Sequence, residues 1–93
     1  MPETFDLDTP WQLAAQVQVR PERFGALLYH FGTRQLSFVK SPALHAVVTS
    51  LAAQPTARAA CAAAGVPPQD LPGYARALGT LAASQMICRR EGA

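Results

Sequence analysis

The sequence predicts an α+β domain of winged-helix type, in which a three-stranded antiparallel sheet is followed by three helices. Three observations lead to this prediction. Apolar and polar residues alternate in the first half of the chain, as is typical of strands that bury one face. After Ser41-Pro42 the apolar period becomes that of a helix. With 93 residues the chain can bury one core, so we expect a single domain over residues 11–93.

The first strand is predicted over residues 11–20, where the residues alternate strictly. One face would carry Trp11, Leu13, Ala15, Val17 and Val19. The following Arg20-Pro21-Glu22-Arg23 should end this strand, because proline has no amide proton to donate to a neighbouring strand.

The second and third strands are predicted over residues 25–31 and 36–40. In the second strand, one face would carry Ala26, Leu28 and His30, and the other face Leu27, Tyr29 and Phe31. The connector Gly32-Thr33-Arg34-Gln35 is short and polar, which favours a hairpin. Short links between sequential strands predict an antiparallel meander with the third strand at one edge.

The first two helices are predicted from their caps. Ser41 is a good N-cap, and proline is tolerated at the first helical position. One face of this helix would carry Leu44, Val47, Val48 and Leu51. The second helix should begin after Pro55, with Thr56 as its cap, and end at Gly65.

The third helix is predicted to begin between Pro68 and Pro72 and to continue to about Met86. Its apolar stripe would consist of Leu71, Tyr74, Leu78 and Leu81, followed by Gln85. Beyond this helix we expect only a short polar tail.

Composition and charge indicate a globular protein, since 49% of the residues are hydrophobic and 15% are charged. The net charge is +2, but three acids and no base lie in the first eight residues. We therefore expect residues 1–10 to form a flexible acidic arm. The remaining basic surplus is too small to predict nucleic-acid binding by itself.

Neither a secretory signal nor an apolar run of the ~18 residues that a membrane span needs is present in the sequence. The two cysteines, Cys61 and Cys88, match neither a metal motif nor a disulfide framework. We expect them to be reduced thiols in a cytoplasmic protein.

The sequence does not predict an enzyme. No carboxylate or cysteine stands at a metal-ligand spacing from His30 or His45, so no metal site is expected. The six acidic residues form no evident acid–base pair, and glycine-rich phosphate motifs are absent. We therefore expect no catalytic residues and no cofactor.

The third predicted strand would leave one row of backbone groups unpaired, and an extended peptide could add to this edge. Two alternatives stay open for the edge itself: the acidic arm could cover it, or a second copy could do so in a homodimer or a permanent oligomer. A further alternative is a winged-helix DNA-binding regulator, although the third helix offers only Arg76, with Arg89 and Arg90 beyond its end.

Two segments carry a family resemblance. They are Arg20-Pro21-Glu22-Arg23-Phe24-Gly25-Ala26-Leu27-Leu28-Tyr29-His30-Phe31-Gly32 and Leu36-Ser37-Phe38-Val39-Lys40-Ser41-Pro42. The sequence resembles the MftB family of mycofactocin-system peptide chaperones, which are similar to PqqD and share the fold called the RiPP recognition element. The resemblance extends from about Trp11 to Met86, and the hairpin is its most specific part.

The resemblance implies a cytosolic chaperone without catalytic activity. Such a protein binds the leader of a ribosomally made precursor peptide and delivers it to a radical S-adenosylmethionine (SAM) maturase, which holds the iron–sulfur clusters. The leader is expected to dock as an added strand on the third strand, beside the third helix.

Carried onto this chain, the resemblance implies a set of peptide-binding residues on these two elements. They are Leu36, Ser37, Phe38, Val39 and Lys40 on the strand, and Tyr74, Leu78 and Leu81 on the helix. For Leu78 and Leu81, core and groove positions are both compatible with the helical stripe. Tyr74 favours the groove, because its hydroxyl needs a polar partner or water.

Overall fold

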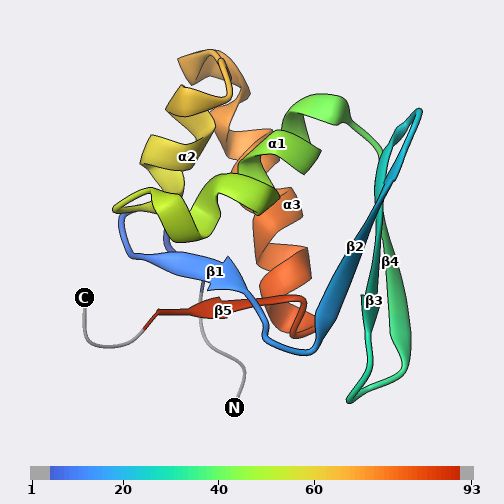
Figure 1. Ribbon diagram of the computed structural model, residues 1–93. Helices are drawn as coiled ribbons and strands as arrows, with labels where there is room; N and C mark the ends of the chain where they lie inside the picture. Colours follow the sequence, from blue (N-terminus) through green and yellow to red (C-terminus); the bar gives the residue numbers. More distant parts are fainter. Residues whose placement is uncertain (1–4, 91–93) are drawn as a thin grey trace.

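The computed structural model describes residues 5–90 (Figure 1). Its elements, in chain order, are β1 (Trp11–Leu13), β2 (Val17–Glu22), β3 (Gly25–His30), β4 (Gln35–Val39), α1 (Pro42–Ser50), a 3₁₀ turn (Leu51–Ala53), α2 (Ala57–Ala63), a second 3₁₀ turn (Pro68–Asp70), α3 (Leu71–Ala83) and β5 (Ile87–Arg89). The predicted α+β class, with a three-stranded antiparallel sheet and three helices, is confirmed.

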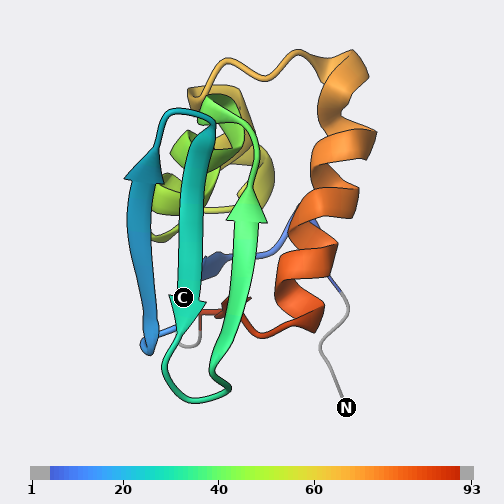
Figure 2. The ribbon, with the colours of Figure 1, turned by 90° about the vertical axis from the view of Figure 1, so that its right-hand side faces the viewer.

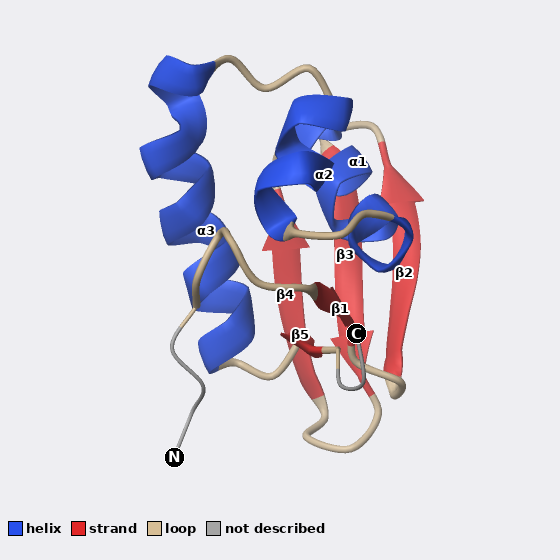
Figure 3. Ribbon diagram, turned by 90° about the vertical axis from the view of Figure 1, so that its left-hand side faces the viewer, coloured by secondary structure: helices blue, strands red, loops and turns tan. Residues whose placement is uncertain are grey.

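The three-stranded sheet has the order β2-β3-β4, with both pairs antiparallel. Its inner face carries the buried side chains of Ala26, Leu28 and Val39, and α1 and α2 lie on this side (Figure 3). No described helix covers the outer face, which is turned toward the viewer in Figure 2. The predicted alternation of faces in the hairpin is confirmed by the alternating burial along β3.

The prediction of one strand over residues 11–20 is wrong, because two strands in different sheets occupy this stretch. Residues of β1 pair with β5, and only from Val17 does the chain join the three-stranded sheet. Between them, the amide of Val17 donates to the carbonyl of Ala14 (3.0 Å) in a turn. Apolar residues alternate in the sequence across both strands and the turn between them, and this unbroken period of two conceals the change of partner.

Two further boundaries differ from the prediction. Strand β2 includes Pro21 and pairs with β3 as far as Glu22. The proline is tolerated because β2 is an edge strand, where a missing amide proton leaves no central ladder incomplete. The expected polar tail contains strand β5, whose Ile87 is buried.

The predicted starts of α1 and α2 and the end of α2 are confirmed by their caps, whereas α3 ends at Ala83 and does not continue to Met86 as predicted. The Oγ of Ser41 accepts a hydrogen bond from the amide of Leu44 (3.1 Å), and the Oγ1 of Thr56 accepts one from the amide of Ala59 (3.1 Å). Gly65 follows α2 with φ +82°, a conformation that glycine adopts without steric cost. These caps fix the start of α1 directly after β4, close to the sheet edge.

The core lies where the sheet, the helices and the β1–β5 pair meet. Its largest fully buried side chains are those of Trp11, Leu28, Leu51, Leu78 and Met86. The indole Nε1 of Trp11 donates to the carbonyl of Asp6 (2.9 Å) and to Oγ1 of Thr9 (2.7 Å).

Residues 5–10 belong to the segment expected to form a flexible arm, of which residues 1–4 lie outside the described part. The ring of Phe5 lies 4.9 Å from that of Trp11, between centroids. The amide of Arg58 donates to the carbonyl of Leu7 (2.8 Å), and its guanidinium forms an ion pair with Asp8 (2.7 Å). The hydrogen bond that the Arg58 guanidinium donates to the Asp8 carboxylate lowers the pKa of Asp8. Residues 5–10 thus contact α2, and the Cβ of Phe5 also lies 3.7 Å from the position that a Cβ on Gly79 of α3 would occupy.

In residues 5–90, every helix is too short or too polar to cross a bilayer.

Candidate functional site

The surface of the protein has a depression between the edge strand β4 and helix α3. Figures 2 and 3 both show α3 running alongside β4. A cavity of about 320 Å³ lies here, lined by Ser37, Phe38, Val39, Leu44, Ala77, Thr80 and Leu81. A second cavity, of about 480 Å³, is lined by Ser41, Leu44, Gln69, Asp70, Gly73, Tyr74, Arg76 and Ala77. Because both contain Leu44 and Ala77, we treat them as one feature, the β4–α3 groove.

One wall of the β4–α3 groove is a strand edge that lacks a neighbour among the described residues. The carbonyl oxygen of Val39 lies 2.1 Å from the position that a Cβ on Gly25 would occupy, so it faces β3. Backbone groups alternate in direction along a strand. The N–H and C=O groups of Leu36 and Phe38 therefore face away from β3 and are available to an added strand.

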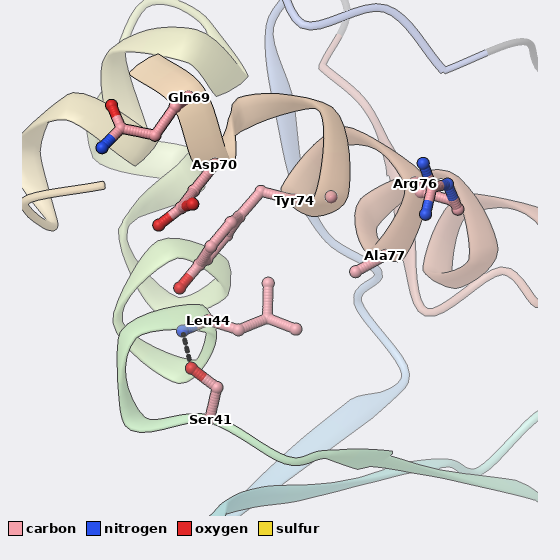
Figure 4. Close-up of a pocket in the computed structure, with 8 residues that line it drawn as sticks. Ser41, Leu44, Gln69, Asp70, Tyr74, Arg76 and Ala77 are labelled. Carbon is pink, nitrogen blue, oxygen red and sulfur yellow. Dashed lines mark hydrogen bonds between the residues drawn. The ribbon is translucent and has the colours of Figure 1, made fainter. Parts of the chain in front are cut away.

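The opposite wall is one stripe of α3. Tyr74, Ala77 and Leu81 follow one another at i, i+3 and i+7, which places them on the same helical face. Figure 4 shows the Tyr74 ring reaching from α3 toward Leu44 and Ser41 at the start of α1. Because Ala77 in the middle of this stripe has a small side chain, it leaves space between Tyr74 and Leu81. The groove extends along the helix through this space.

The charges of the β4–α3 groove lie at one end. Asp70 and Arg76 line the larger cavity, and both are exposed. In Figure 4, Arg76 lies on the far side of α3 from Ser41 and is directed away from Tyr74. The 320 Å³ cavity is lined by apolar side chains together with Ser37 and Thr80. Such a groove favours an extended apolar segment with polar or charged residues at one end.

The structure brings together five of the eight residues that the resemblance implied. Ser37, Phe38, Val39 and Leu81 line the 320 Å³ cavity, and Tyr74 lines the larger one. The side chain of Val39 is fully buried. Its N–H and C=O groups face β3, so Val39 holds β4 in the sheet and offers no backbone hydrogen bond to a ligand.

The other three residues line neither cavity. Leu78 is fully buried, which places it in the core. The side chain of Leu36 is 55% exposed and lies on the outer face of the sheet, with that of Phe38. Lys40 is exposed at the end of β4.

Sequence reasoning missed Leu44, Ala77 and Thr80 as lining residues. Spacing could have identified Ala77, which stands three residues after Tyr74 and four before Leu81. Leu44 was assigned to the apolar stripe of α1, and it does pack against the core while also reaching the groove. A single apolar stripe cannot show which of its members lies at the boundary of the core.

Cys61 and His30 are groups that could take part in chemistry, but their surroundings favour structural roles. Within residues 5–90, no group of three or more His, Cys, Asp or Glu residues is placed to hold a metal ion. Burial raises the pKa of the Cys61 thiol, which disfavours the nucleophilic thiolate. The Nδ1 of His30 accepts hydrogen bonds from the amides of Gly32 (3.0 Å) and Thr33 (3.1 Å), so this histidine orders the β3–β4 turn.

Comparison with known proteins gives a consistent result. The model of the peptide chaperone MftB family matches residues 10–88. The chain is 56% identical over 87 residues to the peptide chaperone MftB of Mycobacterium ulcerans, which covers 94% of this chain and 80% of that protein. It is 54% identical over 87 residues to the protein of that name from Mycobacterium tuberculosis, with the same coverage. Identity to the Mycolicibacterium smegmatis protein is 56% over 84 residues, covering 90% and 82%. No solved structure matches the chain.

Proposed function

The chain belongs to the peptide chaperone MftB family, and we propose that it binds the leader of a ribosomally synthesised precursor peptide and presents it to a radical SAM maturase in mycofactocin biosynthesis. Its family is one of non-catalytic chaperones, so the chemistry and the iron–sulfur clusters belong to the enzyme. The chain contributes recognition and placement of the peptide.

The observation that carries this proposal is the unpaired edge of β4 beside the β4–α3 groove. A leader added as a fourth strand would run about 4.8 Å from β4, within the space between β4 and α3. Its backbone would pair with the outward N–H and C=O groups of Leu36 and Phe38. Alternate leader side chains would then point toward Ala77 and Leu81, and burial of these apolar groups adds to the affinity.

We propose a cytoplasmic location. Cys61 and Cys88 are both free thiols, and such thiols persist where the cell keeps them reduced.

The proposal predicts leader binding that depends little on salt, because backbone pairing and apolar burial drive it. Calorimetric titration with the short peptide encoded beside this protein should give one-to-one binding. Between 50 and 500 mM salt, the Kd should change by less than about threefold, since few ion pairs form. A scrambled leader of the same composition is the control.

The same titration separates the alternatives. A DNA-binding regulator would bind duplex DNA, and its affinity would fall by orders of magnitude over this salt range. A protein that is folded but binds neither ligand would contradict the proposal and indicate an edge already occupied in an oligomer.

A further inference from the structure

The outer face of the β2-β3-β4 sheet carries a second surface that the β4–α3 groove does not include. The centre of this surface consists of two residue pairs on neighbouring strands: Leu27 lies opposite Phe38, and Tyr29 lies opposite Leu36. Two aromatic contacts extend it into the turns. Phe24 lies 6.2 Å from Phe38 and Phe31 lies 5.1 Å from Tyr29, between ring centroids. We call these six residues the outer-face cluster.

The outer-face cluster is exposed. The exposed fractions are 61% for Phe38, 55% for Leu36, 51% for Phe31 and 42% for Phe24. These are the large hydrophobic residues whose side chains are exposed in residues 5–90, and all four lie on this face. A contiguous apolar patch of this kind marks an interaction surface, because scattered single residues would be the ordinary case.

Leader binding in the groove does not account for the outer-face cluster. Of its six members, only Phe38 lines the groove. Figure 2 shows that α3 flanks the sheet at β4 and leaves its outer face uncovered. A fourth strand beside β4 would enlarge this face, and Phe31 and Phe24 would stay exposed at its two ends.

The charges around the outer-face cluster are basic. Arg20 lies on the same face as Leu27 and Phe38, Arg23 and Arg34 lie in the turns at the two ends, and Lys40 follows β4. Glu22 is the acidic residue of this sheet and its turns, and it pairs with Arg20 (3.2 Å). A second copy docked face to face would place these bases against one another, which is unfavourable. The complementary occupant has an apolar centre and a rim of carboxylates.

We propose that the outer-face cluster docks a protein surface with an apolar centre and an acidic rim. This inference rests on the proposed function, and the protein that docks here is the maturase. The enzyme and the leader then occupy different sides of β4 and bind at the same time. Phe38 lies between the two sites. Its backbone forms hydrogen bonds with the leader, and its ring contacts the enzyme.

The test uses two charge substitutions, Phe24→Glu and Phe31→Glu, at exposed positions outside the groove. Each should weaken binding of the purified maturase by at least about tenfold, because a carboxylate enters an apolar contact and faces an acidic rim. Leader affinity, measured by the same titration, should stay within about twofold of the wild type. The matched control is Ala62→Glu, which adds the same charge at an exposed position of α2.

Four results would overturn the inference. The first is wild-type maturase affinity in both variants, which leaves the proposed function intact. The second is a parallel loss of leader binding, which would make the cluster part of the leader site. The third is a wild-type dimer that the substitutions dissociate in sedimentation, which would assign the face to a second copy. If wild-type protein binds leader but not the enzyme, the docking inference fails, while the leader titration decides chaperone function independently.

Discussion

Replacing Phe38 by proline is expected to abolish most leader binding while the protein stays folded. The amide of Phe38 faces away from β3, so its loss leaves the β3–β4 ladder intact, and proline is tolerated on an edge strand. An added leader strand loses one hydrogen bond and is displaced by the proline ring. We expect a cost of about 2–3 kcal/mol, or a roughly 30–150-fold higher Kd in calorimetric titration.

The control for this substitution is Phe38→Ala, which removes the ring and keeps the amide. Because the ring lies at the boundary of the groove, we expect this variant to raise the Kd by less than about tenfold. Circular dichroism and the melting transition should show that both variants are folded. Equal leader affinity in the proline and alanine variants would show that backbone pairing at this position contributes nothing.

Replacing Ala77 by phenylalanine is expected to fill the β4–α3 groove. Ala77 lines both cavities and is half-buried, so a larger side chain projects into the space that the leader would occupy. Forcing a peptide past this ring should cost about 1–3 kcal/mol, as overpacking does in protein cores, or roughly 5–150-fold in Kd. The leader titration measures this change directly.

Ala83→Phe is the matched control for this substitution. It places the same side chain on α3 at an exposed position that lines neither cavity. We expect wild-type leader affinity for it and an unchanged melting temperature within a few degrees. If Ala77→Phe binds leader as tightly as this control does, the peptide does not lie in the groove.

The order and type of the main elements could be predicted because each has a local signature. The hairpin follows from alternation in Gly25–His30 and Gln35–Val39 joined by a short polar turn. The helices follow from caps, of which Ser41 and Thr56 hold amides as expected. These signals depend only on neighbouring residues, so they can be read without knowledge of the tertiary structure.

The β1–β5 pair could not be predicted, because it joins residues separated by most of the chain. Trp11 lies opposite Arg89, and Leu13 lies opposite Ile87. Each strand is too short to carry a clear pattern of its own, and β5 follows a helix without a hairpin signal. Such non-local pairing is fixed by packing around Trp11 in the core, which no local period reveals.

The sequence indicated the strand and the helix that form the candidate site. It did not indicate which of their residues line the groove and which lie in the core. The same stripe of α3 holds the core residue Leu78 and the groove residues Tyr74 and Leu81. Leu78 stands four residues after Tyr74 and three before Leu81, so all three fit one helical stripe, and periodicity does not separate the core residue from the groove residues. On β4, alternation predicts that Leu36 and Phe38 share a face, but only the tertiary structure shows that no helix of residues 5–90 covers this face.

The central claim, that the leader adds to β4 as a strand, is tested most directly by amide hydrogen exchange of the wild-type protein. In the free protein, the outward amides of Leu36 and Phe38 should exchange rapidly, while those of Ser37 and Val39 face β3 and should be protected. A saturating leader should slow exchange at Leu36 and Phe38 by at least about tenfold. Unchanged exchange at both amides, with the leader bound as shown by titration, would contradict strand addition.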